Sequence, residues 1–241
     1  MNNSKNIGDF PALPTLLRHA WAVYMRHPLL LSAACATYLV VTAIGLWLPL
    51  LNLAFLFAGV APLTGGLFIL LRNAHHGTPR PGDLIQGFRE IERWVGVYWC
   101  WVLSMVLPFF PLAIGVFLST RFPGAPWRWY PAYATLALSL CIAVLVLTRF
   151  VYALPLAAQQ PRDTSVSVLF AHSGALVDGR FWASLGRFAL LVIAGLSGVL
   201  VAGVGVLVTL PLALLAFQAL YDARYAAVPF TPESLAEDAA E

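Results

Sequence analysis

The last apolar block of the chain, residues 181–221, most constrains what this sequence can fold into. It is far longer than the roughly 20 apolar residues that one helix needs to cross a bilayer. Gly203 and Gly205 interrupt it, which predicts two crossings joined by a tight turn. Gly195 and Gly198 give the first crossing a smooth face that suits close helix packing. We therefore expect a transmembrane hairpin at this end of the chain.

Composition supports a membrane protein over the whole length. Hydrophobic residues make up 60% of the 241 residues and charged residues 10%, against about 25% charged in an average soluble domain. The net charge is +3 and the basic residues are scattered, so no basic stripe for nucleic acid is present. The three cysteines, Cys35, Cys100 and Cys141, stand singly in apolar runs, which indicates neither a disulfide framework nor a metal site. No cofactor is predicted.

Uncharged runs elsewhere in the chain predict four further crossings. The expected fold is all-α, with six transmembrane helices arranged as three hairpins. The predicted spans are 28–49, 52–72, 94–118, 132–156, 182–202 and 204–222. They form a single transmembrane domain, 15–226, between a disordered N-terminus, 1–14, and a disordered acidic tail, 227–241.

An amphipathic helix on the membrane surface is expected before each hairpin, at 15–27, 83–93 and 164–178. In the first, Ala20 and Tyr24 share an apolar face with Leu17 and Trp21, although the segment could instead be the charged start of the first crossing. A surface helix followed by a hairpin would then be one unit, repeated three times.

The other two surface helices carry recognisable end signals. In the second, Asp83 and Gln86 have the spacing of a capping box. The third is expected to open at Asp163 or Thr164 and to end at Gly179.

Prolines interrupt the second helix of each hairpin, at Pro62, Pro155 and Pro211. Broken helices line substrate sites in many transporters. They are also tolerated as simple kinks, whose freed carbonyl groups find other partners. Both interpretations stay open, and these three residues are candidate helix breaks.

The basic residues predict the orientation through the excess of Lys and Arg in cytoplasmic loops. With the N-terminus in the cytoplasm, eleven basic residues lie on the cytoplasmic side and two outside. The eleven are Lys5, Arg18, Arg26, Arg72, Arg80, Arg89, Arg93, Arg162, Arg180, Arg187 and Arg224, and the two are Arg121 and Arg128. We expect a multi-pass protein of the cytoplasmic membrane, the inner membrane of bacteria, with both termini inside.

Four polar residues at the edges of apolar runs are candidate structural or functional positions: Arg149, Arg180, Arg187 and Asp222. Arg149 either extends its head to the interface or forms a partly buried ion pair with Asp222, since both are predicted at the cytoplasmic side. Arg187 is expected to extend to the interface in the same way.

Several short stretches resemble a group of uncharacterised bacterial six-helix membrane proteins related to the membrane domain of glycerophosphoryl diester phosphodiesterases. They are Arg149-Phe150, Ala153-Leu154-Pro155, Gly179-Arg180-Phe181-Trp182, and GVGVLVTLPLALLAF running into Tyr221-Asp222. The similarity is best over about 149–224. It implies a six-helix bacterial membrane protein without an established activity. The catalytic domain of the phosphodiesterases is absent, so their activity is not implied.

No catalytic motif in the sequence is accompanied by the other residues that its chemistry needs. Gly195-Leu196-Ser197-Gly198 matches the string around the serine of rhomboid intramembrane proteases, but no histidine follows His172 to activate Ser197. His75 and His76 are adjacent, which suits a pair of loop side chains better than metal ligands. No catalytic, cofactor-binding or metal-binding residue is therefore predicted.

The function that these features favour is a non-enzymatic membrane scaffold or lipid-handling component. A small permease that uses the proline-interrupted helices is the alternative, although no carboxylate lies within the spans. An intramembrane hydrolase is a remote third possibility. The expected partners are membrane lipids, and a membrane-protein partner or a second copy of the chain is possible.

Overall fold

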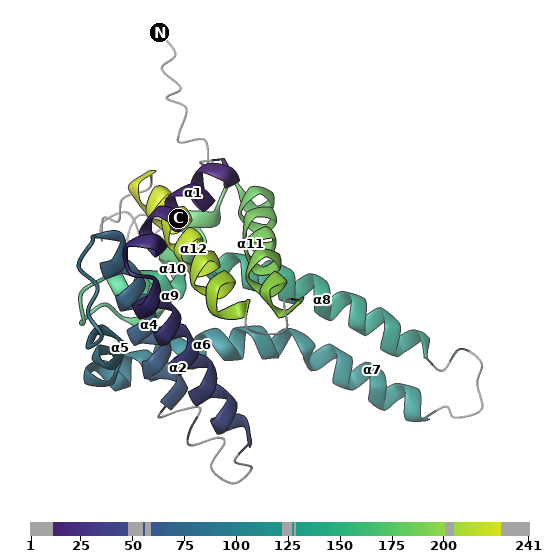
Figure 1. Cartoon of the computed structure of the whole chain (residues 1–241). Helices are drawn as coiled ribbons and strands as arrows, with labels where there is room; N and C mark the ends of the chain where they lie inside the picture. Colours follow the sequence, from purple (N-terminus) through teal and green to yellow (C-terminus); the bar gives the residue numbers. More distant parts are fainter. Residues whose placement is uncertain are drawn as a thin grey trace.

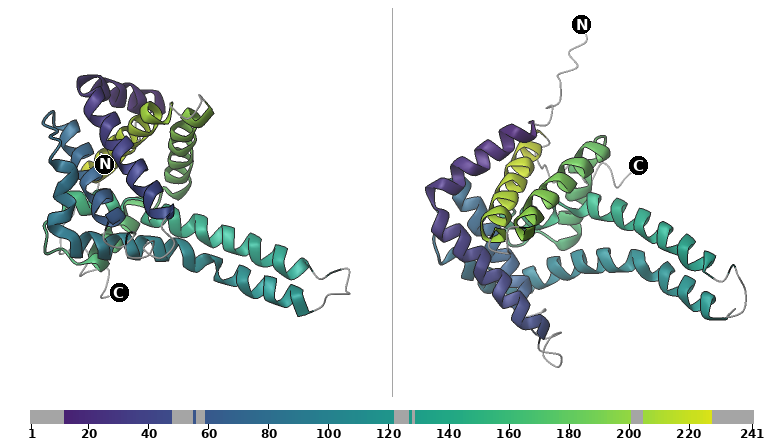
Figure 2. Two further views of the ribbon diagram at one scale, coloured as in Figure 1. Left: turned by 60° about the horizontal axis from the view of Figure 1, so that its bottom comes forward. Right: turned by 45° about the vertical axis from the view of Figure 1, so that its right-hand side comes forward.

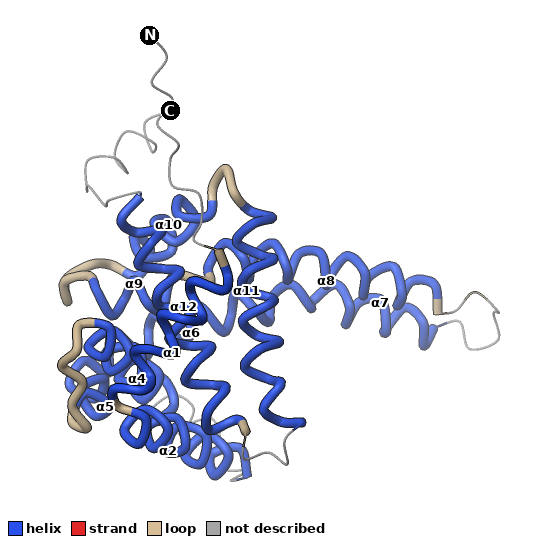
Figure 3. The backbone as a smooth tube through the Cα atoms, turned by 45° about the horizontal axis from the view of Figure 1, so that its top comes forward, coloured by secondary structure: helices blue, strands red, loops and turns tan. Residues whose placement is uncertain are grey.

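The structure, a computed structural model, describes residues 12–47, 55, 59–121, 127, 129–200 and 205–227. Within these ranges the regular elements are all helices, joined mostly by short loops (Figure 3). In chain order they are α1 Leu13–Arg26, α2 Pro28–Trp47, α4 Ala61–His75, α5 Asp83–Gln86, η2 Gly87–Glu90, α6 Ile91–Val106, η3 Leu107–Phe109, α7 Phe110–Arg121, α8 Tyr130–Phe150, α9 Ala153–Gln159, α10 Val166–Val177, α11 Phe181–Leu196, η4 Ser197–Leu200 and α12 Val206–Ala227. The all-α class predicted from the sequence is confirmed.

Five helical stretches of the described residues are long and apolar enough to cross a membrane. They are Pro28–Gly45, Asp83–Arg121, Tyr130–Gln159, Phe181–Val199 and Val206–Ala226. The predicted second span, 52–72, falls partly on residues outside the described ranges, and α4 covers its later part. The predictions for the two termini and for Gly203 also concern residues outside the described ranges.

The helices form a packed body from which one antiparallel pair projects (Figure 1, Figure 2). We call this pair, residues 110–121 and 130–140, the arm, and the remaining helical part the body. Within the arm, α7 lies so close to α8 that a Cβ on Gly115 would come within 1.9 Å of Thr135 Oγ1. A small residue is therefore required at this crossing.

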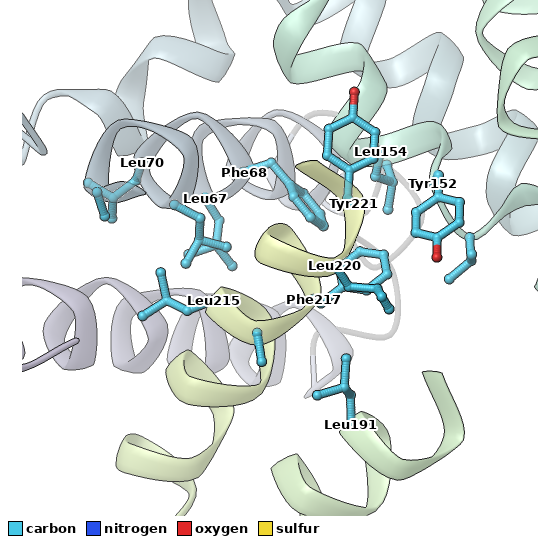
Figure 4. Close-up of a cluster of buried hydrophobic side chains, with 14 of the residues drawn as sticks. Leu67, Phe68, Leu70, Tyr152, Leu154, Leu191, Leu215, Phe217, Leu220 and Tyr221 are labelled. Carbon is cyan, nitrogen blue, oxygen red and sulfur yellow. The ribbon is translucent and has the colours of Figure 1, made fainter. Parts of the chain in front are cut away.

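The core of the body surrounds α12 (Figure 4). Leu215, Leu220 and Tyr221 of α12 are fully buried, and helices α1, α4, α9 and α11 contribute apolar side chains around them. The ring of Phe217 stacks on Tyr152, with 5.8 Å between centroids and 5° between planes. The last helix of the chain is thus the central one.

Helix α1 is separate from α2, because His27 leaves helical geometry at φ −141° and Pro28 begins the next helix. Its buried face carries Leu16, Ala20, Val23 and Tyr24. Of the apolar face predicted for this segment, Ala20 and Tyr24 are buried, whereas Leu17 and Trp21 are exposed. The buried face follows from the packing of α1 on α12.

The predicted surface helix 83–93 is divided into α5, η2 and the start of α6, and its capping box is absent. The carboxylate of Asp83 instead accepts hydrogen bonds from Asn73 Nδ2 and from the backbone N–H of Arg80, both at 2.9 Å. These bonds turn Asp83 towards α4 and away from its own helix.

The third predicted surface helix, 164–178, corresponds to α10. Ser165 caps it through its side chain, which accepts a hydrogen bond from Val168 N. The sequence predicts a slightly earlier start, at Asp163 or Thr164. Gly179 follows the helix with φ +75°, a conformation that glycine adopts without steric cost.

Candidate functional site

An apolar groove of about 430 Å³ opens between helices α2, α4, α6, α9, α11 and α12. Its volume lies within the range of about 300–1,000 Å³ that is usual for small-molecule sites. None of the described residues that line it is charged. We call it the apolar groove; it is lined by Tyr38, Leu39, Thr64, Leu67, Phe68, Tyr98, Trp101, Val151, Leu154, Phe188, Leu191, Val192, Gly195, Leu196, Val206, Leu210, Ala213, Leu214 and Phe217.

A small number of polar groups interrupt this apolar lining. Thr64 donates its hydroxyl hydrogen to the carbonyl of Val60 at 2.8 Å, and its oxygen lies 3.3 Å from the hydroxyl of Tyr38. The indole Nε1–H of Trp101 is buried and has no hydrogen-bond partner. A buried N–H without an acceptor costs free energy, and this one belongs to a residue that lines the groove.

Helix α4, one wall of the groove, is held by unusually close packing on its other faces. A Cβ on Gly66 would lie 1.9 Å from the carbonyl oxygen of Leu84, and a Cβ on Gly87 would lie 1.9 Å from that of Pro62. The ring of Trp94 occupies the space beside Gly65. The small residues of α4 therefore make room for neighbouring backbone and rings.

The three candidate helix breaks have different positions. Pro62 lies in the first turn of α4, and Pro155 lies in the first turn of α9. Pro211 is inside α12, between Leu210 and Ala213, which both line the groove. Of the three, Pro211 is thus the one that lies inside a helix beside the groove, and α12 continues through it.

A cluster of polar side chains surrounds Asp222 near the end of α12. Gln159 Nε2 and Gln218 Nε2 donate to Asp222 Oδ1 at 2.9 and 3.1 Å. Tyr221 donates its hydroxyl hydrogen to Gln159 Oε1 at 2.9 Å. Gln218 is fully buried, and its Oε1 has no hydrogen-bond partner. We call these four residues with His19 and His75 the polar cluster.

The two histidines of the polar cluster connect α1 and α4 to α12. His75 Nε2 lies 3.1 Å from the carbonyl of Leu215, which can only accept, so Nε2 carries the hydrogen. His75 Nδ1 then accepts from His19 Nε2 at 3.3 Å. Burial lowers the pKa of His75 below its ordinary value of 6.5, so this neutral arrangement is favoured.

The predicted ion pair between Arg149 and Asp222 is not formed. Asp222 is bonded to the two glutamines, whereas the guanidinium of Arg149 lies against Gly174 of α10. The backbone carbonyl of Arg149 also accepts a hydrogen bond from Ser173 Oγ at 2.9 Å. Arg149 therefore joins α8 to α10 and does not belong to the polar cluster.

The remaining sequence candidates lie outside the groove and the polar cluster. Arg180 precedes the first residue of α11, and Arg187 is half-buried on the same helix. Ser197 donates to the carbonyl of Ala194 at 2.7 Å and is exposed. Among the described residues, no group of three or more His, Cys, Asp and Glu side chains is placed to hold a metal ion.

Sequence reasoning missed the polar cluster around Asp222 and the unpaired indole of Trp101. One signal was available, because Gln218 and Asp222 are four residues apart and so share a helix face.

Comparisons with protein-family models, with curated proteins and with solved structures found no match to this chain.

Proposed function

We propose that this protein is a non-enzymatic, lipid-handling component of the bacterial cytoplasmic membrane, which holds an acyl chain of a phospholipid in the apolar groove. The observation that carries the proposal is the groove itself, since it lies between helices apolar enough to span a membrane. A groove in such helices is open to lipid, and its uncharged lining suits a hydrocarbon chain.

The polar groups of the groove fit the ester end of such a chain. The unpaired N–H of Trp101 can donate to an ester carbonyl, which would relieve the cost of leaving that donor buried. The hydroxyl groups of Tyr38 and Tyr98 line the same groove and can assist.

A small permease is the second candidate function. Pro211 favours it, because a proline inside a helix beside a groove removes a backbone hydrogen bond at the kind of position where many transporters open a helix to form their substrate sites. The uncharged lining favours the lipid, since carriers of water-soluble substrates generally place polar or acidic ligands at this position.

Photo-crosslinking tests the lipid proposal directly. Protein in nanodiscs is treated with a phosphatidylcholine that carries a diazirine in its acyl chain, and the labelled residues are mapped by mass spectrometry. We expect wild-type labelling at groove residues and its loss in Leu210→Trp, whose indole would fill the groove. Leu138→Trp, at a position of the arm that is 52% exposed, is the matched control and should label as wild type. Equal groove labelling in all three proteins would contradict the proposal.

The topology that goes with the proposal has six spans and both termini in the cytoplasm. Single cysteines at Lys5, Thr78, Gly124 and Ala239, in a background without the native cysteines, report it through a membrane-impermeant thiol reagent on intact cells. We expect only Gly124→Cys to react. A reaction at Thr78→Cys would exclude the six-span arrangement.

A further inference from the structure

A second cavity, of about 350 Å³, lies against helices α4, α6 and α9 and shares no lining residue with the apolar groove. Three arginines, Arg72, Arg93 and Arg162, line it, together with Glu90, Trp94 and Gln160. We call it the arginine cavity. Its residues come from the end of α4, the η2–α6 segment and the chain that follows α9.

The side chains that line the cavity carry more positive than negative charge, because Glu90 is the one carboxylate among the lining residues. Glu90 lies 2.7 Å from Arg162 Nε and 3.5 Å from Arg93 Nη1, so one carboxylate serves two guanidinium groups. Arg72 has no ion pair among the described residues and donates through Nη1 to the carbonyl of Ala158 at 2.6 Å. Among the lining residues three cations therefore face one anion, although the nearby carboxylate of Asp163, which is not part of the lining, also acts on Arg93.

Two buried donors in the cavity have no acceptor. Arg93 has a side-chain exposure of 10%; it donates through Nη2 to the carbonyl of Gln160 at 3.1 Å, but its Nε–H has no partner. Trp94 is 1% exposed, and its indole Nε1–H also has no partner. Buried donors without acceptors are rare and costly, so a ligand oxygen that reached either N–H after a small side-chain shift would stabilise the complex.

From this arrangement we propose that the arginine cavity binds a phosphate group. A phosphate presents oxygens in several directions, so it can accept from guanidinium groups and from an indole N–H at once. A carboxylate offers fewer acceptor sites, and Glu90 already supplies one. The site stands on residues other than those of the apolar groove, so it holds or fails independently of the proposed acyl-chain binding.

The phosphate can belong to a lipid headgroup or to a water-soluble phosphate ester, and the experiment separates these sources. Full-length protein in a neutral maltoside detergent is titrated with sn-glycerol 3-phosphate, with dioctanoyl phosphatidylglycerol and with dioctanoylglycerol, which has no phosphate. Thermal unfolding reports binding through stabilisation by the ligand. We expect stabilisation by glycerol phosphate, or by the phosphatidylglycerol beyond that given by dioctanoylglycerol, whose acyl chains can bind in the apolar groove.

Variants locate the binding in the cavity. Arg72→Gln and Arg93→Gln should each weaken the apparent affinity about tenfold or more, because each removes charge-assisted hydrogen bonds to the phosphate. Arg89→Gln, at an exposed position of η2, is the matched control for loss of one positive charge and should bind as wild type. If Arg93→Gln does not fold, Arg72→Gln carries the test, and phosphate should also protect Arg72 and Arg93 of the wild-type protein from phenylglyoxal.

Each outcome is decisive. Stabilisation by glycerol phosphate assigns the cavity to soluble phosphate esters. Stabilisation by the phosphatidylglycerol beyond that of dioctanoylglycerol, with none by glycerol phosphate, assigns it to lipid headgroups. The proposal would be overturned if glycerol phosphate gave no stabilisation and the phosphatidylglycerol gave no more than dioctanoylglycerol, or if Arg72→Gln and Arg89→Gln bound the phosphate compound with equal affinity.

Discussion

The body and the arm use the same kind of apolar residue in opposite ways. In the body, Leu215 and Leu220 are fully buried around α12, and polar groups such as Gln218 are buried with them. In the arm, Phe117 and Leu138 are 55% and 52% exposed, and the contact between α7 and α8 is made by small residues such as Gly115. The body thus has an interior of its own, whereas the arm is mostly surface.

This difference shows which part of the molecule can hold buried hydrogen bonds and cavities. A two-helix arm has room between its helices only for small groups such as Ser119 and Ser139, and its outer surface is apolar, which suits a membrane. The body has enough interior for larger hydrogen-bonded side chains and for cavities, and both the apolar groove and the arginine cavity are there. Substitutions should therefore have large effects in the body and small ones on the outer face of the arm.

The largest effect is expected for Gly66→Ala in the body. The new Cβ would lie 1.9 Å from the backbone carbonyl of Leu84, which cannot move without shifting α5, so we expect a loss of about 3 kcal/mol in the free energy of unfolding. The melting temperature in detergent measures it. Gly186→Ala is the control, because a Cβ there meets nothing within 4 Å, and a similar loss in that variant would contradict the explanation.

Asp222→Ala should be the next most damaging change, with a loss of about 2 kcal/mol, because Gln159 and Gln218 would lose their shared acceptor. Arg149→Ala acts at a separate contact with α10. The two losses should therefore be additive in the double variant, since the residues share no partner. Strong coupling between the two substitutions in the double-variant cycle would contradict this expectation and would support the ion pair between Arg149 and Asp222 that the sequence predicts.

A smaller effect is expected from acid. Burial lowers the pKa of His75, so between that value and 6.5 the unfolded chain binds more protons than the folded chain. Stability should be complete at pH 7 and should fall as the pH decreases below 6.5. The groups that face His75 are Asp222, His19 and His76, of which the carboxylate opposes the shift. His75→Gln should flatten the melting profile between pH 7 and pH 5, whereas the exposed His76→Gln should leave it unchanged.

The smallest effects are expected on the arm. Phe117→Ala and Leu138→Ala remove side chains that are more than half exposed, so the melting temperature should change by an amount equivalent to less than about 0.5 kcal/mol. A loss as large as that of Asp222→Ala would show that the arm is covered by another protein surface, such as a second copy of the chain.

The sequence was sufficient to predict the helical class and most of the apolar helices, because the length and charge of apolar runs depend on local composition alone. It was not sufficient for residues 83–93. Their apolar side chains Ile85 and Phe88 are exposed, whereas Asp83 and Gly87 are buried against α4. Amphipathic periodicity identifies the apolar face of a helix. It cannot show that glycines elsewhere in the chain allow another helix to pack against the opposite, less apolar face.

The candidate site shows the same limit. The sequence names Asp222 as a candidate polar position and predicts its partner by charge, whereas the structure gives it a pair of amides. A buried carboxylate is satisfied by whichever donors surround it, and tertiary structure decides which those are. The two cavities depend on α4, α6 and α9 together, so no local pattern could predict them.

The packing of α1 on α12 has a consequence for biosynthesis. Of the described helices, α1 is made first and α12 last, yet the buried face of α1, which includes Leu16 and Ala20, rests on α12. During synthesis this face is without its partner until the helices between them have been translated. Contacts between segments so far apart in the sequence form slowly, because the entropy of closing a long loop opposes them. Closure of α1 onto α12 is therefore expected to be a late step of assembly, and a chain that stops before α12 would be left with an uncovered helix for the quality-control machinery of the cell to recognise.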